Sequence, residues 1–345
     1  MATRRELLGQ LALGLGILAC RGVQAREVGS ATFVAIETSA RDVSRALFVS
    51  ATGAILGQSP LDFRAHGMAE HGDTLVVFPR RPGDRFALID KATLLVHGTV
   101  TAPGGRHFFG HGAFSRDGST LIVPENDLET LAGALAIYDV SGTPRRLGAV
   151  ALPGAGPHEV IRMPGSDMFL IALGGLETHP DYGRTPLNLH DFRSQILRYD
   201  LTHGTLDAMG HWAGSEGVSL RHMALDGAGQ LYVGGQIPGD RGGEVLWRVS
   251  PDGIPAALPH GELVGGYVSS VAADGERALV TSKVTGRVLE LEGDRLVRSQ
   301  DLPGASAVGL KGDVKAQAGF TLLALGNDEH VPETGHEFDN HGLLY

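Results

Sequence analysis

Four histidines occupy the same place in a pattern that recurs along the chain. Each is followed by a short apolar run, a turn and a second apolar run, and they are His66, His111, His158 and His222. Imidazoles that converge on one point are ligands that Cu, Fe, Zn and Ni prefer. The pattern therefore predicts a histidine ring that binds a transition metal, with Fe or Cu expected. Two alternatives are a structural histidine duplicated with the repeat and a polar channel that holds water or an anion.

Other polar residues follow the second apolar run of several repeats. An antiparallel hairpin would return these residues to the level of the histidines. The candidate metal ligands among them, or residues that orient the ligands, are Glu125, Glu177 and His179. His341, which precedes a short stretch at the C-terminus, is a further candidate ligand. Arg80, Arg81 and Lys283 are candidate contacts for an anion, because guanidinium and ammonium groups suit carboxylates and phosphates.

The sequence assigns no catalytic residue. It has no Gly-x-Ser-x-Gly elbow, no His-Glu-x-x-His, no P-loop and no Cys-x-x-Cys-His. These absences disfavour a serine hydrolase, a zincin metalloprotease, a P-loop nucleotidase and a covalent haem protein. Whether the protein is an enzyme stays open at this point.

The elements that position the histidines are short strands. Apolar runs of about five residues alternate with turns such as Asp117-Gly118 and Asp274-Gly275. Four such strands recur in each unit of about 40–50 residues, which is typical of a β-propeller blade. Units begin near residues 63, 106, 153, 214, 265 and 304, and residues 31–62 supply a partial one. We therefore expect a single-domain, all-β, seven-bladed propeller over residues 26–345, closed by pairing of its N- and C-terminal strands.

Residues 1–25 have the character of an export signal. Thr3-Arg4-Arg5-Glu6-Leu7-Leu8 is a twin-arginine pattern, an apolar run from Leu11 to Ala19 follows, and Val23-Gln24-Ala25 fits a small-x-small cleavage site. We expect a periplasmic protein with no transmembrane segment in its mature chain. Cleavage after Ala25 leaves no cysteine, whereas lipidation at Cys20, the one cysteine, would anchor the protein instead.

Composition agrees with a globular β protein. The 345 residues include 50 Gly and 17 Pro, which disfavour long helices, and 42% are hydrophobic, which disfavours disorder. The formal net charge is −10, whereas nucleic-acid-binding proteins usually present a basic surface, so no nucleic-acid partner is expected.

The chain resembles an uncharacterised bacterial family, domain of unknown function 1513. The resemblance is carried by Arg106–Ser115, Glu125-Asn126-Asp127, Gly156–Glu159, Gly174–Arg184, Arg221-His222 and Phe338–His341. Residues 236–265 look short beside the family pattern. Members resemble twin-arginine-exported propellers and tend to be encoded beside imelysin-like periplasmic proteins tied to iron uptake. The resemblance thus implies metal handling with periplasmic iron-uptake proteins as partners.

Three functions remain open from the sequence. The first is a periplasmic metal-binding propeller, engaged in iron acquisition, that holds a transition metal or a metal-containing ligand. The second is a metal-dependent enzyme, redox or hydrolytic, that uses the same face. The third is a metal-free scaffold that docks a partner protein on this face or on the long loop 177–194.

Overall fold

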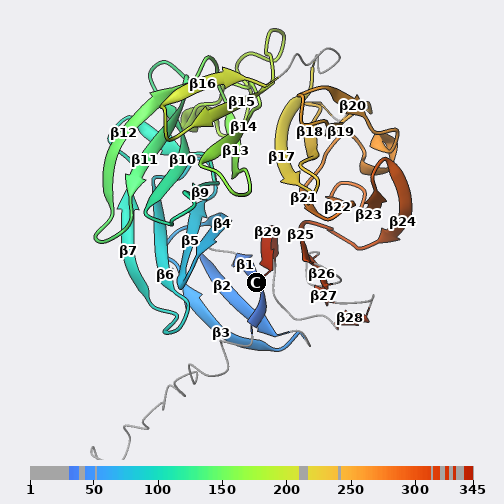
Figure 1. The fold of residues 1–345 in the computed structure, drawn as a ribbon, viewed down its shortest axis with the longest axis horizontal. Coiled ribbons are helices and arrows are strands. Elements are labelled where there is room, and N and C mark those ends of the chain that lie inside the picture. Colours follow the sequence, from blue (N-terminus) through green and yellow to red (C-terminus); the bar gives the residue numbers. More distant parts are fainter. Residues whose placement is uncertain are drawn as a thin grey trace, which may run out of the picture.

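The protein is an all-β propeller whose sheets are arranged in a ring (Figure 1). The computed structural model describes residues 31–38, 43–50, 53–209, 217–239, 242–311, 314–318, 323–325, 329–331 and 338–344. The export segment expected over residues 1–25 lies outside them. Within the described ranges, no helix has the length and apolar character needed to cross a membrane.

The described strands form seven antiparallel sheets. The first combines the last strand of the chain with the first three, in the order β29 (Phe338–Leu344), β1 (Ala31–Thr38), β2 (Ser44–Ser50) and β3 (Ile55–Pro60). The second comprises β4 (Ala65–His71), β5 (Thr74–Pro79), β6 (Arg85–Asp90) and β7 (Val96–Thr101). The third comprises β8 (Arg106–Phe108), β9 (Ala113–Phe114), β10 (Thr120–Asp127), β11 (Gly133–Asp139) and β12 (Arg145–Ala151).

The remaining four sheets follow in chain order. One comprises β13 (Pro157–Arg162), β14 (Met168–Leu173), β15 (Gln195–Asp200) and β16 (Thr205–Ala208), with the 3-10 helix η1 (Pro180–Tyr182) in its long loop. The next comprises β17 (Ser219–Leu225), β18 (Leu231–Gln236), β19 (Leu246–Val249) and β20 (Pro255–Ala257), followed by η2 (Gly261–Val264). The last two comprise β21 (Ser270–Asp274), β22 (Arg277–Ser282), β23 (Arg287–Glu292) and β24 (Arg295–Asp301), then β25 (Ala307–Lys311), β26 (Val314–Ala318), β27 (Leu323–Leu325) and β28 (Glu329–Val331).

Neighbouring sheets meet along their inner strands. The contacts run in cyclic order through β4, β9, β13, β17, β21, β25 and β29, and β29 contacts β4 as well as β25. β29 also pairs with β1, with Phe33 opposite Leu344 and Val34 opposite Leu343. The two ends of the described chain therefore share one sheet.

The core lies between adjacent sheets rather than on the axis. The middle strands read as continuous apolar runs because both of their faces are covered, as in β5, whereas the outer strand β12 alternates exposed and half-buried residues. Phe86, for example, packs edge-on against Phe108 and Tyr138 of the next sheet, with ring centroids 5.2 and 5.4 Å away. Packing between sheets supplies the apolar burial and leaves polar side chains of the inner strands free to face the axis.

Candidate metal centre

Five buried or partly buried histidines meet on the axis. His66 lies on β4, His158 on β13, His222 on β17 and His341 on β29, whereas His111 lies in the short segment between β8 and β9. Five different sheets thus contribute one imidazole each. The four histidines predicted from the repeat and the predicted C-terminal His341 are all brought together.

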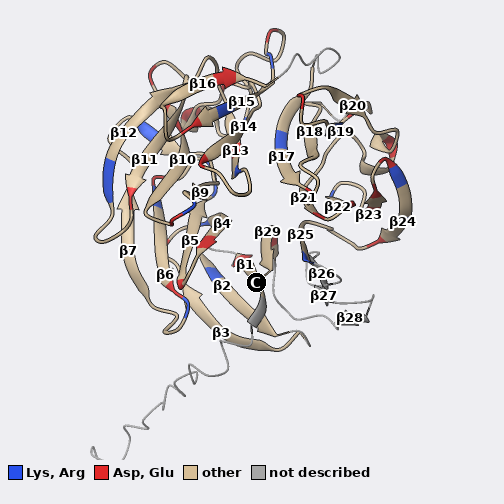
Figure 2. Ribbon diagram, viewed as in Figure 1, with Lys and Arg blue, Asp and Glu red and all other residues tan. Residues whose placement is uncertain are grey.

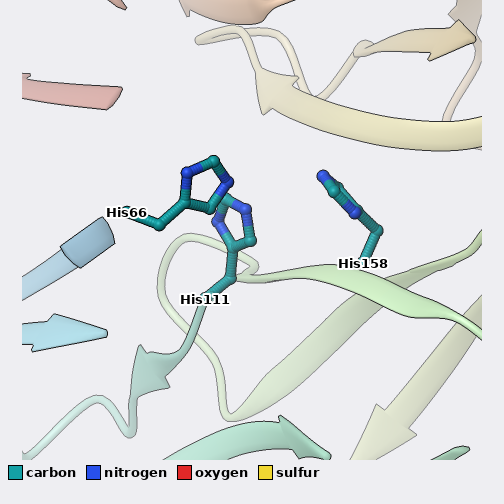
Figure 3. A group of neighbouring side chains, drawn as sticks. All are labelled: His66, His111 and His158. Carbon is teal, nitrogen blue, oxygen red and sulfur yellow. The ribbon is translucent and has the colours of Figure 1, made fainter. Parts of the chain in front are cut away.

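The imidazoles form two triads that share His111. In one, a ring nitrogen from each of His66, His111 and His158 lies within 4.8 Å of the others. In the second triad, His111, His222 and His341 meet the same criterion. Figure 3 shows the side chains of the first triad extending from separate segments of the ring into a shared space. Ring centroids lie 4.6 Å apart for His111 and His341 and 5.0 Å apart for His222 and His341.

Two glycines allow His66 and His111 to approach each other. The backbone N–H of Gly67 donates a 3.0 Å hydrogen bond to the carbonyl of Gly110, which joins the two segments directly. A Cβ on Gly67 would lie 2.3 Å from that carbonyl oxygen, and one on Gly110 would lie 2.7 Å from the ring of His66. Gly110 also has φ of 105°, a conformation that disfavours other residues. Larger residues at these positions would therefore separate the two imidazoles.

Two carboxylates stand behind the imidazoles. Asp339 places one oxygen 2.9 Å from Nδ1 of His66 and accepts a 2.8 Å hydrogen bond from Arg80 with the other. Glu159 places its oxygens 3.4 Å from Nδ1 of His111 and 3.6 Å from Nδ1 of His222, and it accepts a bond from the N–H of Met223. At His66 and His111, a carboxylate on Nδ1 favours the tautomer whose Nε2 lone pair is available to a metal, whereas Glu159 is too far from Nδ1 of His222 for a hydrogen bond. His158 differs, because Arg221 lies 3.5 Å from its Nδ1.

Burial keeps these histidines neutral. Desolvation lowers the pKa of His66, His158, His222 and His341 below the ordinary histidine value, and it lowers the pKa of His111 to about 3. For His66, this effect exceeds the opposing effect of Asp339. Neutral imidazoles are the form that ligates metals.

Several of their ring nitrogens have no hydrogen-bond partner within the described part of the chain. These buried atoms are Nε2 of His111, His158 and His341 and Nδ1 of His222. Buried polar groups are normally paired, so unpaired ones need an explanation such as an ion. The donor set, which is neutral nitrogen throughout, fits a transition metal and does not suit the oxygen-preferring Mg²⁺ or Ca²⁺.

The other predicted ligands lie elsewhere. The carboxylate of Glu125 is fully buried, but it accepts hydrogen bonds of 2.8 Å from Arg106 and 2.7 and 2.8 Å from Arg146. The expectation that it joins the ring is not met, because its side chain faces these two neighbours within its own sheet. Glu177 belongs to neither triad, and its backbone N–H donates a 2.9 Å hydrogen bond to Oδ1 of Asn188. His179 caps η1, where its Nδ1 accepts a 3.2 Å hydrogen bond from the N–H of Asp181.

Glu125→Gln should therefore lower stability without changing metal content. The substitution leaves two guanidiniums, each about a quarter exposed, without their shared counter-charge. We expect a loss of about 2 kcal/mol in unfolding free energy, below the range for a fully buried pair because the arginines reach solvent. Urea unfolding measures the loss, and Glu129→Gln, at an exposed position in the turn after β10, is the control. Loss of bound metal in Glu125→Gln would instead restore Glu125 as a ligand.

The predicted anion contacts lie beside the histidines. Arg80, Arg81 and Lys283 line one pocket of about 390 Å³, together with Arg184, Arg221 and Tyr267. The sequence reasoning assigned no role to Arg184, Arg221, Glu159 or Asp339. Each of the four lies within a segment that carries the family resemblance, and Glu159 and Arg221 are immediate neighbours of ring histidines. These positions were the sequence features from which a role in the site could have been predicted.

Comparison with known proteins identifies the fold and a family. Residues 59–345 match the model of a protein family of unknown function, DUF1513. The hydrazine synthase of Kuenenia stuttgartiensis has a similar structure, with a TM-score of 0.64 at 15% identity over 83% of this chain and 90% of that one. The WD40 repeats of RRP9 are similar at a TM-score of 0.57 and 13% identity, over 83% and 87% of the two chains. At these identities the likeness concerns the fold alone. No curated protein matches the sequence significantly.

Proposed function

Given that the chain belongs to the DUF1513 family, we propose that it binds a transition metal, or a metal-containing ligand, at its histidine cluster. The observation that carries the proposal is the pair of buried triads that share His111. Placing five uncharged imidazoles on one axis, with ring nitrogens desolvated and unpaired, costs free energy that a bound metal would offset.

His66, His111, His222 and His341 are the principal ligands in this proposal. Asp339 orients His66, and Glu159 lies close enough to Nδ1 of His111 to orient that ring. His158 is a weaker ligand because the guanidinium of Arg221 approaches its Nδ1, which favours the tautomer with hydrogen on Nε2. Imidazole nitrogens suit both of the metals expected, Fe and Cu.

We also propose that the protein works in the periplasm, in iron or other metal acquisition. The twin-arginine pattern at Thr3–Leu8 supports export, and the family resemblance supports an association with periplasmic iron-uptake proteins. We infer, in addition, that each of the seven sheets is one blade and that the β29–β1 pairing closes the ring. The cyclic contacts of the inner strands support this inference.

Metal analysis tests the proposal. Untagged protein purified from its native periplasm should contain stoichiometric metal by mass spectrometry. Protein stripped with a chelator should regain thermal stability on titration with Cu or Fe, because a ligand that binds only the native state raises its stability. Zn, which also accepts three histidines, is the comparison metal. Native protein without metal, and stripped protein that gains no stability from any of the three, would overturn the proposal.

A further inference from the structure

A basic pocket opens directly onto the histidine cluster. Two neighbouring cavities share Arg80, Arg81, Arg184, Arg221 and Tyr267 in their walls. The smaller cavity, of about 50 Å³, is also lined by His66, His158 and His222. The larger one, of about 390 Å³, is also lined by Lys283. A molecule in the larger cavity would thus lie next to the smaller cavity that the imidazoles line.

The basic residues converge on the cavity from separate parts of the ring. Arg80 and Arg81 follow β5, Arg184 lies in the long loop after β14, Arg221 is on β17 and Lys283 follows β22. Figure 2 shows basic segments on outer strands such as β12 and β24, but also on the inner strand β17. The chain as a whole carries a net negative charge, so the convergence of these basic residues on one cavity does not follow from the overall composition.

These cations repel one another. Burial lowers the pKa of Arg81, and the charges of Arg221, Arg184 and Arg80 lower it further. Burial and the charges of Arg80 and Arg184 likewise lower the pKa of Lys283. Asp339 offsets part of this charge through its ion pair with Arg80. The second nearby carboxylate, Glu159, lies behind the imidazoles, and burial raises its pKa. A cluster of buried like charges costs electrostatic free energy, and a bound anion would offset that cost.

The walls also include apolar surface. Leu176, Ile237, Pro238 and Val284 line the larger cavity alongside the cations. An inorganic anion would leave these side chains unused, whereas a short carbon skeleton would contact them. The volume is in the lower part of the range found for small-molecule sites. Guanidinium groups bind carboxylates in a bidentate manner, which suits several carboxylates on one molecule.

We propose that this pocket binds a small organic polycarboxylate, with one carboxylate directed through the smaller cavity toward the histidines. The anion site stands on its own residues. A contact between that carboxylate and a bound metal rests on the proposed function above. If the anion site and the metal contact both hold, the protein takes up a metal together with its carboxylate chelator, or it holds a carboxylate substrate beside a metal.

Calorimetric titration with citrate tests the anion site in metal-free protein. Wild-type protein should bind citrate, and Arg81→Gln and Arg221→Gln should each raise the Kd at least tenfold. Arg81→Lys, which keeps the charge, should recover part of the affinity. Arg298→Gln, at an exposed position on β24, is the matched control and should bind as wild type does. Thermal unfolding of each variant checks that it is folded.

Each contrary outcome is decisive. No citrate binding by the wild type, or equal binding by folded Arg81→Gln and Arg221→Gln, would overturn the anion site. Equal or tighter binding of inorganic phosphate with the same dependence on the arginines would overturn the assignment to a carboxylate. The metal contact is tested separately by comparing metal-loaded with metal-free protein. Citrate should bind the loaded form at least tenfold more tightly, and equal affinities would overturn that contact while leaving both sites in place.

Discussion

His111→Asn should lower metal affinity more than loss of any other histidine of the cluster. His111 is the one member common to both triads, so its removal leaves neither with three imidazoles. Loss of a group that merely orients a ligand already costs about 10–100-fold in affinity, and we expect a loss of about 100-fold or more for this shared ligand. His158→Asn should cost roughly tenfold or less, because the second triad stays intact and Arg221 already opposes ligation by His158.

Competition with a chelator of known affinity measures these differences. His97→Asn, at an exposed position on the outer strand β7, is the control for a histidine away from the axis. Each variant is compared with wild type in the metal-free form, so that a folding defect is recognised separately. Equal losses for His111→Asn and His158→Asn would contradict the shared role of His111.

The metal-free protein should lose stability steeply as the pH falls below about 6.5. Burial lowers the pKa of all five histidines in the folded state, to about 3 for His111, whereas in the unfolded chain they titrate near 6.5. Between these values the unfolded state binds more protons, so stability rises with pH. The contribution of the histidines is therefore complete above about pH 6.5 and is lost as the pH falls toward the folded-state values. Glu159, whose pKa is raised by burial, acts in the opposite sense above its unfolded value.

This acid sensitivity should be large relative to the whole stability of the protein. One pKa unit corresponds to about 1.4 kcal/mol, and domains are stable by only about 5–15 kcal/mol. Urea unfolding of metal-free protein from pH 8 to pH 4 measures the slope. The double variant His111→Asn with His222→Asn should show a shallower slope, since it has fewer groups to titrate. A stability that is flat from pH 8 to pH 5 in the wild type would contradict the neutral, desolvated state of the cluster.

The sequence predicted the residues that the repeat itself places and failed where tertiary contacts decide. The repeat places a histidine near the start of the inner strands β4, β13 and β17, so His66, His158 and His222 could be located from the sequence alone. The ends of the second strands are less uniform. β10 continues to Asp127, and Glu125 faces Arg106 and Arg146 in its own sheet instead of the axis. His179 lies in a loop whose course no repeat predicts.

Asp339 and Arg184 show why some residues of the site could not be predicted from the sequence. Asp339 reaches His66 only because β29 contacts β4, a contact between residues 273 positions apart in the sequence. Arg184 enters the pocket from a long insertion. Local patterns carry no information about such contacts. Asp339 is nevertheless buried, with one carboxylate oxygen beside the His66 ring.

The position of β29 has a consequence for the order in which the histidine cluster can assemble. This strand carries both His341 and Asp339, and it pairs with β1, the first described strand. The ligand set is therefore incomplete until β29 has paired with β1, so metal capture would follow this pairing during folding. A variant in which the two strands cannot pair would lose a ligand and the partner of His66 together.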